Sequence, residues 1–166
     1  MHVLAYRRQP RISGNRQVCK FPVFDANRGA TENSLIGFES SLVVENNYGY
    51  VDPYSVLGKD TTVPGMSRID LDPGTTEGCR LIWDNRSVSI PSVVSKLNWP
   101  DRIIYTYTKE SSGWYLVGLD FDTGKTKFRQ YSGNKWKSNN HFSAISLLDN
   151  RSLLIGTLTG LSRFVG

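Results

Sequence analysis

Two glutamates and a histidine are the side chains of this sequence best suited to acid–base chemistry. Glu32 and Glu45 each stand beside asparagines, and His141 follows the pair Asn139-Asn140. Carboxylates and imidazoles donate and accept protons in catalysis. Carboxylate and amide oxygens also hydrogen-bond sugars and coordinate hard cations such as calcium. Because asparagine also bonds its own backbone in turns, a purely structural role is the alternative at each pair.

Motifs for a defined catalytic chemistry are missing from the sequence. It has no glycine-rich phosphate loop, no serine in a nucleophile elbow and no metal-binding pair of histidines. His2 and His141 are its only histidines, and His2 falls in a predicted outer strand, so a Ser-His-Asp triad would depend on His141. We therefore assign no catalytic residue and no metal ligand from the sequence.

The elements that must position these residues are short β-strands. The stretch 114–129 predicts two strands joined by an Asp-Thr-Gly turn, in which Gly124 supplies the positive backbone angle of a tight hairpin. Alternation in its first half puts Tyr115, Val117, Leu119 and Phe121 on one face, as in a half-buried strand.

A similar layout recurs along the chain. Three inner strand pairs are predicted at 33–47, 92–109 and 142–159, with turns at Glu39-Ser40, Pro100-Asp101 and Asp149-Asn150. Outer strands follow them at 66–71 and 78–83, at 115–121 and 126–130, and at 160–164. Segments 2–6 and 17–24 form a further outer pair with no inner pair ahead of them. Recurring units of this length indicate a repeat architecture.

These repeats resemble the quinoprotein-like, or PQQ-type, β-propeller superfamily. The segments that carry the resemblance are 113–131 and 156–161. The chain also resembles the C-terminal part of larger bacterial propeller proteins, through segments 32–37, 44–50 and 139–141. The resemblance implies an all-β partial propeller of about three four-stranded blades in an incomplete ring. It divides this single domain into an outer half-blade at 1–24, blades at 32–84 and 92–131, and an incomplete blade at 141–166.

In the propellers that the chain resembles, ligands bind on the face formed by loops entering the first strands and leaving the second strands. The resemblance therefore implies one loop face for ligand binding, and the carboxylate, amide and imidazole groups on these loops are of the types that a small polar ligand would use. The candidate ligand-binding residues are Glu32, Asn33, Glu45, Asn46, Asn47, Tyr48, Lys96, Lys109, Asn139, Asn140 and His141.

The family name raises the question of a quinone cofactor. Alcohol dehydrogenases of this superfamily hold their quinone on a tryptophan floor under adjacent cysteines. This sequence has no adjacent cysteines, and it places Trp83, Trp99, Trp114 and Trp136 on outer strands or loops, where tryptophan packs between blades or at edges. We expect no cofactor.

Charge and cysteine content leave two alternatives open. The net charge of the 166 residues is +5, and its basic groups are Arg7, Arg8, Arg11, Arg16 and Lys20, and Lys125, Lys127, Arg129, Lys135 and Lys137. The favoured interpretation is that they protect exposed strand edges, and nucleic-acid binding is the alternative. Cys19 and Cys79 are either buried free thiols or one disulfide. Neither a signal leader nor an apolar span is found, so we expect a soluble chain.

A partial set of blades leaves strand edges and apolar faces open to water. The chain is therefore expected either to be the remainder of a longer propeller or to form a homo-oligomer. The sequence favours a non-catalytic, self-associating binding or scaffold protein of the propeller type. The alternative is a hydrolase or lyase acting on a polar, carbohydrate-like substrate, with Glu32 or Glu45 as acid or base and His141 nearby.

Overall fold

The computed structural model describes residues 21–72, 78–149 and 151–166, which form three antiparallel sheets. The first sheet contains β1 (Ile36–Phe38), β2 (Ser41–Glu45), β3 (Met66–Leu71) and β4 (Cys79–Asn85). The second contains β5 (Lys96–Asn98), β6 (Ile103–Glu110), β7 (Gly113–Asp120) and β8 (Thr126–Gly133). The third contains β9 (Ile145–Leu148), β10 (Ser152–Thr157) and β11 (Gly160–Val165). One 3-10 turn, Trp136–Ser138, precedes β9, and the described residues include no α-helix.

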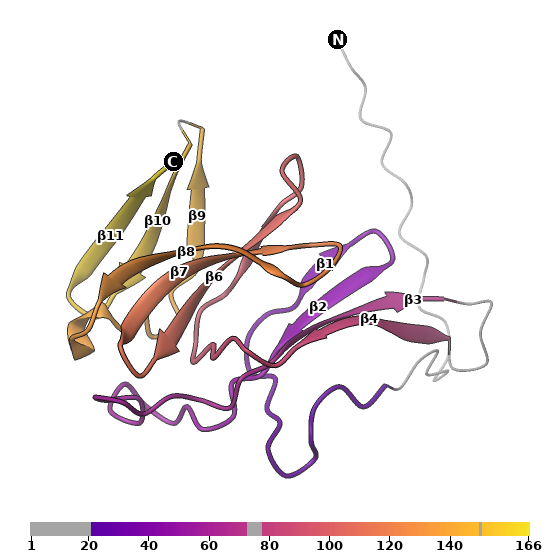
Figure 1. Cartoon of the computed structure of the whole chain (residues 1–166), viewed down its shortest axis with the longest axis horizontal. Coiled ribbons are helices and arrows are strands. Elements are labelled where there is room, and N and C mark those ends of the chain that lie inside the picture. The colour runs from indigo at the N-terminus through magenta and orange to yellow at the C-terminus, as the bar shows by residue number, and fades with distance from the viewer. Residues whose placement is uncertain (1–20, 73–77, 150) are drawn as a thin grey trace, which may run out of the picture.

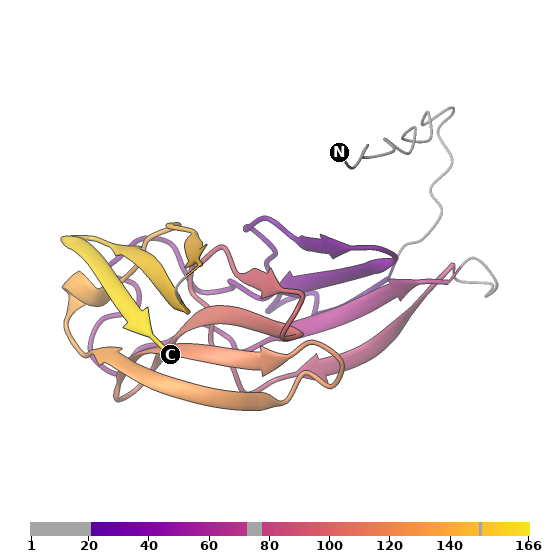
Figure 2. The ribbon, with the colours of Figure 1, turned by 90° about the horizontal axis from the view of Figure 1, so that it is seen from above.

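The sheets lie side by side, with the second between the first and the third (Figures 1 and 2). Within each sheet the strands follow chain order, and neighbouring strands are antiparallel. A parallel bridge between Val94 and Ala144 joins the segments that lead into β5 and β9. The predicted inner and outer strand pairs from β1 to β11 are confirmed, and the described residues form no closed ring.

A repeated backbone hydrogen bond shows that the three sheets are built alike. The carbonyl of the residue before each second strand accepts the amide of the residue that ends, or directly follows, the third strand. The donor–acceptor pairs are Leu71 with Ser40 (2.7 Å), Phe121 with Arg102 (2.9 Å) and Gly166 with Arg151 (2.9 Å). Corresponding positions of the sheets can therefore be compared residue by residue.

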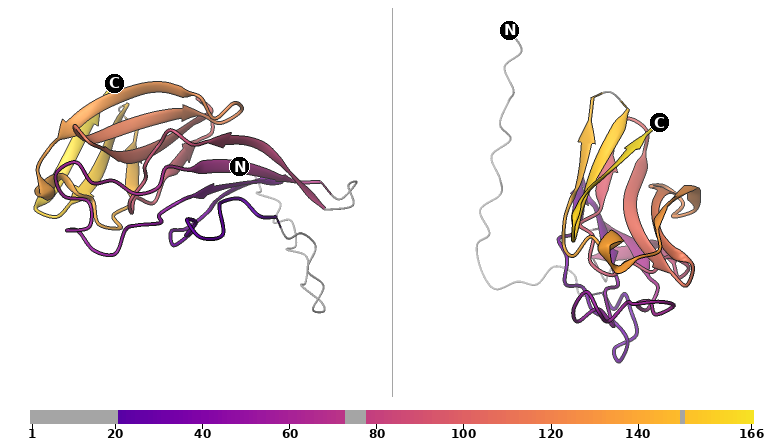
Figure 3. Two further views of the ribbon diagram at one scale, coloured as in Figure 1. Left: turned by 60° about the horizontal axis from the view of Figure 1, so that its bottom comes forward. Right: turned by 90° about the vertical axis from the view of Figure 1, so that its left-hand side faces the viewer.

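The strand β7 corrects the prediction of a half-buried strand. Leu116, Val117 and Leu119 are all buried, although they point to alternate sides of the sheet. Leu116 lines the groove between the second and third sheets, and the first sheet lies on the other side of the second (Figure 3). Because a sheet covered on both faces needs no polar side, alternation of buried and exposed residues is lost.

The turn after β7 agrees with its prediction. Gly124 has φ +69°, in the left-handed region that glycine adopts at no steric cost. Asp120 fixes this turn, because its Oδ1 accepts the amides of Asp122 (3.1 Å) and Thr123 (2.9 Å). The same carboxylate lies 3.0 Å from the Lys127 Nζ on the exposed strand β8.

The beginning of the described chain differs from expectation. Phe21 to Phe24 form no strand, so the prediction of a strand through 17–24 is wrong for these residues. Phe21, Val23 and Phe24 instead pack on the outer face of the first sheet, against a small cluster of Val44, Ile69 and Cys79. Burying aromatic side chains on an apolar sheet face stabilises the segment without strand pairing.

Several sequence predictions fall in the N-terminal part. Segment 2–6, most of 17–24, the first basic group and Cys19 lie outside the described residues. Cys79 is disulfide-bonded, which excludes a free thiol at that position. No helix in the described ranges is long and apolar enough to cross a bilayer.

Candidate functional site

The predicted loop face is organised by the long connection between β2 and β3, residues 46–65. It runs beneath the second sheet toward the segment before β9 (Figure 1). Asn46 and Asn47 begin it and are fully buried. The Asn46 Oδ1 accepts the Ala30 amide at 3.1 Å, and the Asn47 Nδ2 donates to the Ile90 carbonyl at 3.0 Å. Both side-chain amides therefore bind backbone groups, which favours a structural role over ligand binding for this pair.

The second asparagine pair has the same role. The Asn139 Oδ1 accepts the His141 amide at 2.9 Å, and its Nδ2 donates to the Pro53 carbonyl at 3.4 Å. The Asn140 Nδ2 donates to the Ser143 carbonyl at 2.9 Å. Both asparagines are buried, so their amides are directed to the protein itself.

Lys109 is buried against the same connection. Only 2% of its surface is exposed, and its Nζ donates to the carbonyls of Gly58 (2.9 Å), Asp60 (3.2 Å) and Glu110 (2.7 Å). Burial lowers the pKa of this lysine. Its three donors are all used. Lys109 therefore fastens the β2–β3 connection to the second sheet.

Glu45 is the one candidate whose chemistry is strongly altered by its surroundings. It is 4% exposed, and burial raises its pKa to about 7. The Ser95 amide donates to its Oε1 and the Asn33 Nδ2 to its Oε2, each at 3.3 Å. A pKa near neutrality suits a general acid or base.

The other candidates are separate from this carboxylate. The ring of His141 is exposed, and its Nδ1 lies 2.9 Å from the Tyr50 Oη. Tyr48 and Glu32 are exposed. Lys96 lies at the start of β5 and lines a cavity of about 270 Å³ between β1 and β5. Glu45 and His141 share no hydrogen-bond partner in the described part of the chain, and neither lines this cavity.

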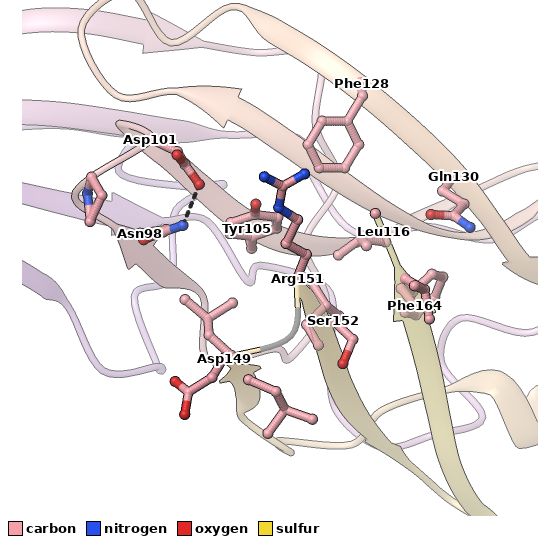
Figure 4. Close-up of a pocket in the computed structure, with 16 residues that line it drawn as sticks. Asn98, Asp101, Tyr105, Leu116, Phe128, Gln130, Asp149, Arg151, Ser152 and Phe164 are labelled. Atoms are coloured by element: carbon pink, nitrogen blue, oxygen red, sulfur yellow. Dashed lines mark hydrogen bonds between the residues drawn. The ribbon is translucent and has the colours of Figure 1, made fainter.

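A groove of about 660 Å³ lies between the second and third sheets (Figure 4). Its apolar residues include Leu116, Leu153 and Phe164, and its aromatic wall is formed by Tyr105 and Phe128, whose ring centroids are 5.9 Å apart. Its polar residues include Asn98, Asp101, Gln130, Asp149 and Arg151. Apolar walls with a few polar groups are typical of ligand sites of this size.

Arg151 is the cation of this groove. Its guanidinium points into the hollow on the side of Tyr105 and Phe128 (Figure 4). The guanidinium of Arg151 has no hydrogen bond or ion pair with another described residue. A planar guanidinium with free donors can bind a carboxylate or phosphate through two parallel hydrogen bonds.

Sequence reasoning did not select any residue of this groove. Its aromatic and aliphatic residues look like ordinary core positions, and the groove forms only where two sheets meet. One signal was available, because Arg102 and Arg151 both directly precede the second strand of an inner pair.

In the described residues, no three histidine, cysteine, aspartate or glutamate side chains gather into a group that could hold a metal ion. The comparisons with known proteins add no candidate activity. No protein-family model matches the chain, and no curated protein sequence does.

Proposed function

We propose that the protein is a non-catalytic scaffold or binding protein of the β-propeller type, which associates with further copies of itself. In this proposal each sheet is a blade. Supporting observations are the common strand order of the sheets, their side-by-side arrangement and the repeated hydrogen bond before each second strand. Propellers are built from such radially repeated sheets.

The exposed apolar side chains on the outer face of the third sheet are the observation that carries self-association. Leu153, Ile155 and Phe164 point toward the second sheet and are buried. Leu161 and Val165 point the other way and are 73% and 60% exposed. Aliphatic side chains on an uncovered sheet face mark a surface that another apolar surface can bury.

The contacts of the loop-face residues support the non-catalytic part of this proposal. Its asparagines and Lys109 are saturated by backbone groups, and Glu45 is enclosed by Asn33 and Ser95. A substrate would have to displace these contacts before it could reach the carboxylate.

Light scattering tests the proposal directly. The wild-type protein is expected to have a mass of two or more copies, and Leu161→Lys is expected to shift it to one copy. Val51→Lys is the matched control, because Val51 is 85% exposed and lies on the β2–β3 connection. A monomeric wild-type protein would rule out self-association.

A hydrolase or lyase acting on a polar substrate is the second candidate, favoured by the pKa of about 7 at Glu45. Turnover of carbohydrate-like substrates that disappears in Glu45→Gln would support it over the scaffold.

A further inference from the structure

Exposed apolar side chains gather on the β2–β3 connection and on the segment before β9. Six of the fifteen exposed large apolar side chains of the described residues lie within 48–57 and 136–142. They are Tyr48, Val51, Tyr54, Leu57, Trp136 and Phe142, which we call the loop patch. Apolar side chains that are exposed singly are ordinary on protein surfaces, whereas a gathering of them marks an interaction surface.

Direct contacts join the two segments of the loop patch. The Asn139 Nδ2 donates to the Pro53 carbonyl at 3.4 Å, and the Tyr50 Oη lies 2.9 Å from the His141 Nδ1. The ring of Tyr50 also lies edge-on to that of Phe142, with centroids 5.5 Å apart. The loop patch is therefore one surface formed by both segments, where the β2–β3 connection reaches the segment before β9 (Figure 1).

Contacts within the chain fix the backbone that carries the loop patch. The Asp52 Oδ1 accepts the amides of Tyr54 (2.8 Å) and Ser55 (3.0 Å), and Lys109 fastens the turn that follows. Val51 and Tyr54 nevertheless have 85% and 67% of their surfaces exposed. Side chains that project from a fixed backbone lose less conformational freedom on binding than those of a mobile loop.

Lysines flank the loop patch in both segments. Lys59, Lys135 and Lys137 are exposed, and none of them forms an ion pair with another described residue. Asp52 caps its own turn, and Asp60 lies against the buried lysine that fastens this connection. The surface around the patch therefore has an excess of positive charge, which complements an anionic partner.

We propose that the loop patch docks on a membrane surface that contains anionic lipid. Its apolar side chains enter the headgroup region, and the three lysines bind lipid phosphates. Tyrosine and tryptophan favour this boundary, because one end of each side chain is apolar and the other is polar. Lysines beside the membrane add electrostatic attraction. The proposal goes beyond self-association, which uses the outer face of the third sheet.

The composition of the loop patch favours a lipid surface over other partners. None of its six side chains lines either of the two cavities described above, so neither cavity brings them to a small ligand. Single-stranded nucleic acid would stack on the aromatic rings but would gain nothing from Val51 and Leu57, and neither segment contains an arginine. A fluid interface accepts protruding side chains, whereas a protein partner would need a hollow that matches them.

Vesicle sedimentation tests the proposal with the whole chain. The wild-type protein is expected to bind vesicles of phosphatidylcholine mixed with phosphatidylglycerol more tightly than vesicles of phosphatidylcholine alone, and salt should weaken the binding. Replacing Val51 and Tyr54 together by serine should weaken it roughly tenfold or more, because two apolar side chains no longer leave water. Lys135→Gln combined with Lys137→Gln should weaken it about tenfold and reduce its salt dependence.

Matched variants and a fluorescence probe separate docking from effects on folding. Leu81→Ser on β4 and Lys125→Gln after β7 change exposed side chains outside the patch, and each should alter the affinity by less than about twofold. Lipid brominated in its acyl chains should quench the tryptophan fluorescence of the bound protein, and Trp136→Phe should remove most of that quenching. Trp99 is the internal control, because it stacks on Phe38 outside the loop patch.

Absence of binding to the anionic vesicles, or equal binding by the variant with serine at positions 51 and 54, would overturn the proposal. Binding to a single-stranded oligonucleotide but not to vesicles would also overturn it and would assign the patch to nucleic acid. Light scattering without lipid reports self-association independently, so either proposal can fail without the other.

Discussion

Replacing Gly124 by alanine should destabilise the protein through two separable effects. Gly124 has φ +69°, and holding a residue with a side chain in the left-handed region costs about 1–2 kcal/mol. A methyl group there would also lie 2.6 Å from two ring carbons of Trp83, which a side chain can relieve only by moving the indole. Overpacking of this kind costs about 1–3 kcal/mol.

Gly58 provides the control for the backbone effect. Its φ is +59°, and nothing lies within 4 Å of the position that a methyl group would take. Gly58→Ala should therefore lose only the backbone contribution. For a chain of this size each kcal/mol lowers Tm by about 2–4 °C, so Gly124→Ala should melt roughly 2–12 °C below Gly58→Ala.

Thermal and urea unfolding monitored by circular dichroism would measure the difference. In a Trp83→Leu background, the additional loss of stability of Gly124→Ala relative to Gly58→Ala should be smaller, because the indole that the methyl group contacts is gone. Coincident melting of the Gly124→Ala and Gly58→Ala variants would refute the contact between the β7–β8 turn and the first sheet.

Glu45 and Lys109 give two further predictions. The pKa of Glu45 is raised to about 7 from its ordinary value of 4.5, so the folded state holds the proton more tightly and the free energy of unfolding should fall by about 3 kcal/mol between pH 4.5 and 7. Urea titrations should show that fall in the wild-type protein and not in Glu45→Gln, and an equal fall in both would exclude Glu45 as its source. Lys109→Met should cost about 1–3 kcal/mol, because three carbonyls lose their donor, and should speed hydrogen exchange in residues 46–65. Lys96→Met, at an exposed position, should stay within about 0.5 kcal/mol of wild type, and similar exchange in both variants would contradict the fastening role of Lys109.

The strands were predictable because their signals are local. Turns at Glu39-Ser40 and Pro100-Asp101 and the glycine at 124 interrupt apolar runs at short range, and each strand pair joins neighbours in sequence. The burial of β7 on both faces was not predictable, because it depends on which sheets flank it. The packing of Phe21 on the first sheet is likewise a contact between distant parts of the chain.

The candidate site was harder to predict for a related reason. Residue type cannot distinguish an amide that binds a ligand from one that binds a backbone carbonyl, and Asn47 and Asn140 do the latter. Glu45 ends a strand of otherwise ordinary sequence, and its raised pKa results from burial in the folded chain.

The two ends of the sheet array are not equivalent, and this bears on how copies would associate. The outer face of the first sheet is covered by Phe21, Val23 and Phe24, whereas Leu161 and Val165 on the third sheet are exposed. Head-to-tail association would require a third sheet to displace that aromatic cover, and repeated contacts of this kind would continue into a filament. Two third sheets meeting face to face would bury both exposed surfaces at once and would stop at two copies. Self-association through Leu161 should therefore give a closed dimer of twice 18.7 kDa.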